Sequence, residues 1–181
     1  LGIPESQNQI GNYYFDYQVS KDRGTGGNGL MPSPTQINDM QEAAKWWRKA
    51  AEQGYAPAQY SLGYFYTFNP YAHDGLSTAD AHTESVKWFR KAAEQGHRAA
   101  KYRLWYIWFM DTVNRVASVN GVHFKDPHAL SSEEALKWLR MAAEQGHAES
   151  QYWLSVFYTD DKGRFMPHDY QEAYFWRMLF L

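Results

Sequence analysis

The chain has 181 residues, a formal net charge of −2 and no cysteine, and 18% of its residues are aromatic. This length is enough for one domain or one small repeat array with a buried core. The near-neutral charge argues against a nucleic-acid partner, because phosphate binding needs clustered Lys and Arg. No apolar stretch is long enough for a transmembrane helix. The absence of cysteine excludes a disulfide scaffold or a thiolate site and leaves the compartment open.

Aromatic residues are the most unusual part of the composition. The chain contains 8 Trp and 14 Tyr. Many of these side chains would fill the core of a globular protein, but Tyr and Trp are also enriched at protein interfaces. The composition therefore favours binding to another protein over binding to nucleic acid or to a membrane.

Both ends of the sequence suggest that the natural chain is longer. Leu1 stands where an initiator Met would be, which indicates a removed leader or a trimmed start. The last residues, WRMLFL at 176–181, stop within an apolar helical pattern. Because solenoids normally end in a polar cap, we expect natural sequence to continue beyond residue 181.

A short sequence motif occurs three times along the chain. RKAAEQG occupies residues 48–54 and 90–96, and RMAAEQG occupies residues 140–146. The closing glycines of the copies are 42 and 50 residues apart (54 to 96 and 96 to 146), spacings that indicate a solenoid. The closing glycines predict left-handed residues that end a helix, and the alanine pair supplies small side chains where two helices approach closely. The predicted structural glycines are Gly54, Gly96 and Gly146.

Apolar residues at helical spacing predict a pair of helices in each repeat. The first pair begins with IGNYY at 10–14, a degenerate copy of LGYFY at 62–66. Ser131 and Asp169 each precede a glutamate by three residues, which is the spacing of a capping box. In chain order the helical segments lie at about 10–14, 40–51, 56–66, 86–93, 98–108, 136–143, 148–158 and 170–181, with loops at roughly 15–35, 67–80, 109–131 and 159–168.

The recurring pattern resembles the Sel1-like repeat, a relative of the tetratricopeptide repeat. The resemblance lies in APAQYSLGYFY from residue 56 and in EALKWLRMAAEQGH from residue 134. KGRFMPHDY at 162–170 is similar to the Gly-x-x-x-Pro-x-Asp-Tyr loop of that family. The chain departs from the family where Trp105 and Ser155 replace a small glycine, and in the long loops predicted above.

The resemblance implies an all-α fold, a right-handed superhelical α/α solenoid of helix pairs similar to tetratricopeptide repeats, with about four repeats. We expect one domain over residues 1–181. Its repeats would cover approximately 8–54, 55–96, 97–146 and 147–181, the last of them incomplete.

The sequence offers little that could perform catalysis. The glycine-rich run at 24–29 resembles a phosphate loop, but no Gly-Lys-Ser/Thr follows it and no strand precedes it, so a flexible loop is the better interpretation. His123 and His128, with Asp126 between them, do not have the spacing of a helical metal site and also indicate a loop. His97 and His147 occupy the same repeat position and are predicted to be structural.

Paired carboxylates do not change this expectation. Asp160 and Asp161 are predicted to lie in a loop, and Glu133 and Glu134 in the first turn of a helix, where acidic residues are favourable. No nucleophile and base occur in a known catalytic order. We therefore predict no enzyme activity, no cofactor and no metal.

Aromatic residues of the first helix in each pair are the strongest candidates for binding. In related repeat folds this helix lines the concave side, and Leu62, Gly63 and Tyr66 would face the neighbouring helices. An exposed amphipathic patch marks a binding site, whereas the alternative is that these side chains fill a tightly wound superhelix. The predicted aromatic stripe comprises Tyr60, Tyr64, Phe68, Tyr102, Tyr106, Phe109, Tyr152 and Val156, and the tryptophans predicted to pack between repeats are Trp46, Trp88, Trp138 and Trp176.

These features predict a non-enzymatic module that binds another protein through the concave aromatic stripe, with the long loops adding specificity. The resemblance implies several roles, of which the most specific is an immunity protein that neutralises a lipase-like toxin delivered by type VI secretion. That role would place the chain in the bacterial periplasm, with the cytoplasm as the alternative. A signalling adaptor is the second expectation. A β-lactam-binding or β-lactam-hydrolysing enzyme is a remote third, because such family members are rich in cysteine.

Overall fold

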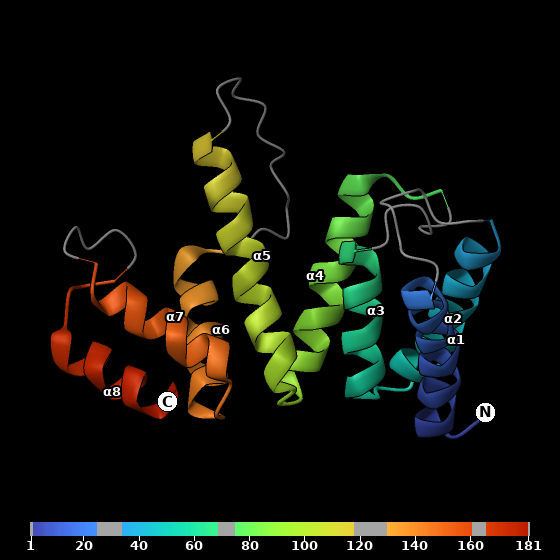
Figure 1. Cartoon of the computed structure of the whole chain (residues 1–181), viewed down its shortest axis with the longest axis horizontal. Helices are drawn as coiled ribbons and strands as arrows, with labels where there is room; N and C mark the ends of the chain where they lie inside the picture. The colour runs from blue at the N-terminus through green and yellow to red at the C-terminus, as the bar shows by residue number, and fades with distance from the viewer. Residues whose placement is uncertain (1, 25–33, 69–74, 118–129, 161–165, 181) are drawn as a thin grey trace. The chain divides into compact units, whose positions relative to one another are not determined.

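The computed structural model describes residues 2–24, 34–68, 75–117, 130–160 and 166–180, which form eight α-helices in consecutive pairs (Figure 1). This confirms the predicted all-α repeat fold. The chain divides into two compact units, Leu1–Gln95 (unit 1) and Gly96–Leu181 (unit 2). Unit 1 contains α1 (Pro4–Gly24), α2 (Pro34–Glu52), α3 (Ala56–Phe68) and α4 (Thr78–Glu94), and unit 2 contains α5 (Arg98–Ala117), α6 (Ser132–Glu144), α7 (Ala148–Tyr158) and α8 (Tyr170–Phe180).

Two helices extend into segments that the sequence predicted as loops. Helix α1 continues to Gly24 and α5 continues to Ala117. Neither 12–23 nor 109–117 contains Gly or Pro, so nothing in the backbone chemistry of these segments ends a helix. The predicted loops at 15–35 and 109–131 were therefore placed too early in the chain.

Helix starts follow the predicted capping residues. The Ser131 hydroxyl accepts a hydrogen bond from the Glu134 amide at 3.1 Å and begins α6. One carboxylate oxygen of Asp169 accepts the amides of Gln171 at 2.9 Å and Glu172 at 3.2 Å. Ser77 plays the same part at α4, where its hydroxyl accepts the Asp80 amide at 3.1 Å. Each cap satisfies backbone donors that the first helical turn leaves without a partner.

The recurring motif ends α2, α4 and α6 as predicted. Gly54, Gly96 and Gly146 have φ angles of 87°, 92° and 78°, a conformation that favours glycine. At the first copy the Gly54 amide donates to the Ala51 carbonyl at 3.0 Å and the Tyr55 amide donates to the Ala50 carbonyl at 3.2 Å. These two bonds form a Schellman motif. The alanine pair thus supplies both the acceptors of the cap and a buried, small-residue surface.

A buried glutamine joins this cap to the helix that follows. The Gln59 side-chain amide donates to the Ala51 carbonyl at 3.1 Å, and Gln151 donates to Ala143 at the same distance. Lys101 occupies the equivalent position of α5 and is only 3% exposed. Burial lowers the pKa of the Lys101 amine, and the Glu144 carboxylate partly opposes that shift.

Glycines on the first helix of a pair allow the second helix to approach closely in unit 1. A Cβ atom at Gly63 would lie 2.8 Å from Phe89, and one at Gly11 would lie 2.6 Å from Trp47. Phe89 and Trp47 are buried and occupy equivalent positions of α4 and α2. The contact of α1 with α2 supports the interpretation of IGNYY as a degenerate first copy.

Among the described helices, none combines the length and the apolar character that spanning a membrane requires.

Candidate protein-binding surface

In unit 1 the aromatic stripe consists of three neighbouring rings on α3. The ring centroids of Tyr60 and Tyr64 are 6.4 Å apart, and those of Tyr64 and Phe68 are 4.5 Å apart. Tyr60 also packs against Phe89 of α4 at 5.7 Å, and Phe68 is 43% exposed at the end of the helix. The two tyrosines are half-buried. The first of the three rings, Tyr60, is therefore packed against α4, whereas the last, Phe68, is exposed to solvent.

In unit 2 the stripe on α5 is more closely packed. Tyr102 and Tyr106 lie 6.0 Å apart and are half-buried. Phe109 stacks on Trp105 at 5.2 Å and lies 5.2 Å from Trp153 of α7. The structure thus brings Phe109 into contact with α7, and Phe109, like Tyr102 and Tyr106, retains partial exposure.

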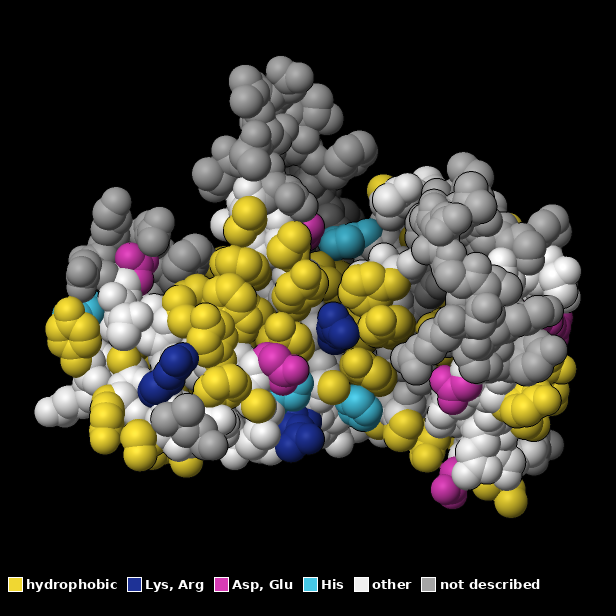
Figure 2. Space-filling model, in the orientation of Figure 1, with side chains coloured by type: hydrophobic (Ala, Val, Ile, Leu, Met, Phe, Trp, Pro, Cys, Tyr) yellow, Lys and Arg dark blue, Asp and Glu magenta, His cyan; other side chains and the backbone are white. Residues whose placement is uncertain are grey.

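Helix α7 continues this surface toward α8. Tyr152 is 37% exposed, and its ring lies 5.6 Å from that of Phe180. The Arg177 guanidinium lies 5.5 Å from the Tyr152 ring centroid. Val156, one turn after Tyr152, is half-buried. Figure 2 shows hydrophobic side chains gathered over α5 and α7 in unit 2, and such a patch is typical of an interaction site.

Two histidines begin the first helix of each pair in unit 2, and one of them, His147, touches this surface. The His147 Nδ1 atom accepts the Ser150 amide at 3.3 Å and caps α7, and the His97 Nδ1 atom accepts the Ala100 amide at 3.3 Å at the start of α5. The His147 ring also packs on Tyr102, with centroids 4.6 Å apart. Both histidines therefore have the structural position that the sequence predicted.

Their capping role depends on neutral imidazole, because a protonated Nδ1 cannot accept a hydrogen bond. Burial lowers the pKa of His147, and Arg98 and Arg103 lower it further, while Glu149 opposes them. Burial and then Arg98 lower the pKa of His97. At pH values just below the ordinary histidine pKa, each histidine therefore binds fewer protons in the folded protein than in the unfolded protein.

We expect His147→Asn to reduce the loss of stability on acidification. A lowered folded-state pKa contributes stability that is present above about pH 6.5 and is lost as the pH falls through the folded-state value. Asn caps a helix without titrating, so the variant should lose less free energy of unfolding than the wild type between about pH 7 and pH 5 in urea denaturation. His147→Ala, which removes the cap, should be less stable at both values. An unchanged pH dependence in H147N would contradict the capping role.

Tryptophans at the predicted packing positions donate to a glutamate one turn earlier. The Trp88 and Trp176 indoles donate to Glu84 and Glu172, each at 3.0 Å, and both rings are 3% exposed. Trp138 donates to Glu134 at 3.5 Å and is half-buried. Trp46 is also half-buried, and the Lys49 amine lies 4.2 Å from its ring centroid.

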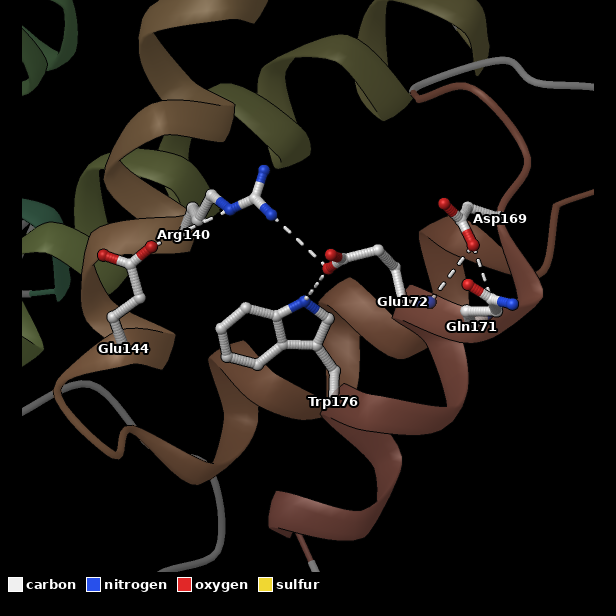
Figure 3. A network of polar contacts seen from close by, with 6 residues as sticks. All are labelled: Arg140, Glu144, Asp169, Gln171, Glu172 and Trp176. Atoms are coloured by element: carbon white, nitrogen blue, oxygen red, sulfur yellow. Dashed lines mark hydrogen bonds and ion pairs between the residues drawn. The ribbon is translucent and has the colours of Figure 1, made fainter.

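Figure 3 shows how this contact joins a larger network in unit 2. Glu172 of α8 accepts Trp176, and the same oxygen lies 3.4 Å from the Arg140 guanidinium of α6. Arg140 also lies 3.8 Å from Glu144 on its own helix. These groups are partly exposed, so their ion pairs contribute little stability. The Arg140–Glu172 ion pair links α6 to α8, which packs against α7.

Several residues considered in the sequence lie outside the described part of the chain. They are 25–29 of the glycine-rich run, His123, Asp126, His128 and Asp161. Within the described ranges, no group of three or more His, Asp or Glu residues is placed to hold a metal ion.

Some residues of the surface were missed by the sequence reasoning. Arg103 and Arg177 lie against stripe rings, and Trp153 packs on Phe109. Alignment of the repeats could have indicated the two arginines, because the equivalent residues in unit 1 are the uncharged Ser61 and Phe89. Helical periodicity alone could not have indicated them, because a change of residue type in one repeat is not periodic.

Successive helix pairs, the first three of which end at a left-handed glycine, define a helical-repeat scaffold. The chain belongs to the Sel1 repeat family, whose profile matches residues 27–55, 56–97, 129–147 and 148–176. A search of curated proteins finds no match.

Two bacterial proteins of known structure are similar to the chain over 98% of its length. One is a protective antigen of uropathogenic Escherichia coli strains displaying an SLR fold, with 24% identity and a TM-score of 0.63. The other is a Sel1 repeat protein from Oxalobacter formigenes, with 27% identity and a TM-score of 0.60. The chain spans 30% of the first protein and 57% of the second.

Proposed function

We propose that this Sel1 repeat chain is a non-enzymatic module that binds a protein partner through the aromatic stripe. The observation that supports this most directly is that partly exposed rings lie on α3 in unit 1 and on α5 and α7 in unit 2, the helices that follow the closing glycines. Tyr60, Tyr64, Tyr102, Tyr106 and Tyr152 combine a large apolar area with a hydroxyl group, and such side chains dominate the binding energy of protein interfaces.

The packing of stripe rings onto buried side chains supports the same proposal. Tyr60 rests on buried Phe89, and Tyr102 rests on buried Trp105 and on His147. Side chains held in this way lose little rotamer freedom when a partner binds. The mechanism is occupancy, in which the bound chain blocks whatever surface of its partner it covers.

The specific role that we propose is neutralisation of a secreted bacterial toxin, such as a lipase-like effector of type VI secretion, in the periplasm. An inhibitor of this kind needs a preformed surface for one partner and no catalytic group, and the stripe fits the first requirement. Co-purification of the chain with the product of the neighbouring gene tests the role. A neighbour that encodes no toxin, or the absence of a nanomolar complex, would exclude it, and a sensor kinase as the captured partner would favour the signalling adaptor instead.

Replacing Tyr64 and Tyr106 together by alanine is expected to weaken binding of the captured partner by at least about 2 kcal/mol. The reason is that each side chain presents an anchored ring to solvent on the stripe. Isothermal titration calorimetry measures the affinity, and thermal denaturation measures stability in parallel. The matched control is Tyr13→Ala, a 68% exposed tyrosine outside the stripe. A loss of stability at unchanged affinity would show instead that these tyrosines only fill space.

A further inference from the structure

We propose that the unit 2 part of the stripe binds an acidic segment of the partner, one in which Asp or Glu residues flank apolar anchors. This inference rests on the proposed function and names the chemistry of the occupant. It starts from two cations that lie directly on stripe rings. The Arg103 guanidinium lies 5.9 Å from the Tyr106 ring centroid, and the Arg177 guanidinium lies 5.5 Å from Tyr152 and 5.8 Å from Phe180.

The repeat scaffold does not need a cation at either position. Ser61 of α3 and Trp153 of α7 are the equivalents of Arg103, and Trp47, Phe89 and Leu139 are the equivalents of Arg177. These residues are neutral, and those equivalent to Arg177 are buried. The two arginines are therefore particular to this surface of unit 2.

A guanidinium that stacks on a ring is well suited to bind a carboxylate. One flat face of the group interacts with the π system, while its N–H groups point along the plane and match the two oxygens of a carboxylate. The ring also holds the side chain in place, so less conformational entropy is lost on binding. A peptide whose apolar residues pack on Tyr106 and Tyr152 would bring adjacent acidic residues to Arg103 and Arg177.

The other charges around the stripe agree with an acidic partner. Arg98, one turn before Tyr102, donates to the carbonyls of Gln145 at 3.1 Å and Gly146 at 3.4 Å. Asp111 follows Tyr102 by nine residues, which places it on the opposite side of α5. Glu149 lies 3.5 Å from the His147 ring, and Asp160 follows Val156 by one turn, just past the end of α7. Among the described residues near the stripe in unit 2, the three arginines outnumber these two carboxylates.

A random-peptide library displayed on phage, selected against the immobilised full chain, tests the proposal without knowledge of the partner. We expect enriched peptides to place Asp or Glu beside Phe, Trp or Leu. The double variant R103Q/R177Q should bind an enriched peptide about tenfold more weakly, since two partly exposed charge pairs together contribute about 1.4 kcal/mol. The control K137Q removes one positive charge from an exposed residue of α6, half the change in the double variant, and should bind normally. Circular dichroism verifies that each variant is folded.

The outcomes separate this inference from the proposed function. Enrichment of neutral or basic peptides that depend on Tyr106 would overturn the acidic segment and leave the stripe as a binding surface. Acidic peptides that bind R103Q/R177Q as well as wild type, or that lose equal affinity with K137Q, would overturn the assignment to these arginines. No enrichment of any peptide would count against both proposals.

Discussion

Gly63→Leu is expected to lower the free energy of unfolding by about 3 kcal/mol, at the upper end of the range for overpacked cores. Even a Cβ atom at Gly63 would lie 2.8 Å from Cδ1 of Phe89 and 3.0 Å from Cε1. Phe89 is fully buried, so its ring has no space into which it can move. Leucine adds three further carbons at this contact, and α3 and α4 must separate to accommodate them. Urea denaturation followed by circular dichroism measures the loss.

Two variants show whether this loss comes from the contact itself. Ser61→Leu adds a side chain of the same size on the same helix, where the equivalent residues Arg103 and Trp153 are already large. We expect it to cost less than about 1 kcal/mol. Combining Gly63→Leu with Phe89→Ala should destabilise by less than the sum of the single losses, because the smaller side chain opens the space that leucine needs. Additive losses would mean that the two positions do not meet.

The repeat architecture could be predicted because its signals are local and recur. The RKAAEQG motif contains the small residues, the cap acceptors and the left-handed glycine that end a helix. Because it occurs three times, the repeat can be recognised even though the segments between the copies vary. Ser131 and Asp169 likewise begin their helices where the capping spacing placed them. Each of these signals acts within a few residues of its own position.

The ends of α1 and α5 were harder to predict, because loops were assigned where the apolar helical pattern of the repeats stopped. Neither 12–23 nor 109–117 contains Gly or Pro, so both helices continue beyond that pattern. The buried Gln59 was missed for a different reason. A glutamine among polar and apolar neighbours has the pattern of a surface residue, and only the structure shows that its amide reaches the Ala51 carbonyl of the preceding helix.

The candidate surface was predicted in outline and refined by the structure. The spacing of Tyr60 and Tyr64 identified one side of α3, and both side chains are partly exposed there. The same spacing could not separate Phe109, which packs against Trp153 of α7, from Tyr152, which remains 37% exposed. Helical periodicity predicts the direction of a side chain, but exposure depends on which neighbouring helix covers it.

Trp105→Ala is expected to lower the free energy of unfolding by about 4 kcal/mol, the size typical of a buried tryptophan replaced by alanine. This is the largest effect that we predict, and it occurs at the position equivalent to Gly63. The side chain is fully buried, and its ring lies within 5.5 Å of Tyr102, Phe109 and Trp153. Its removal leaves a cavity between α5 and α7 and withdraws the support of the stripe in unit 2.

The same repeat position thus accommodates either a very small or a very large residue, because the size of the residue packed against it differs between repeats. Gly63 faces Phe89, whereas Trp105 occurs in the repeat where the residue equivalent to Phe89 is the smaller Leu139. Ser155, a third equivalent, is small, and its hydroxyl bonds to the Tyr152 carbonyl of its own helix. Ser155→Ala should therefore change stability by less than about 1 kcal/mol, as a matched control for Trp105→Ala.

Trp105→Phe separates the contribution of packing from that of the indole nitrogen. The Trp105 Nε1 atom is buried and has no hydrogen-bond partner among the described residues, so removing this donor offsets part of the packing that phenylalanine loses. We expect W105F to lose about 1 kcal/mol, well below the loss of W105A. Thermal denaturation of both variants measures the difference. If W105A retained wild-type stability, the aromatic cluster of unit 2 could not be the support on which Tyr102 and Tyr106 depend.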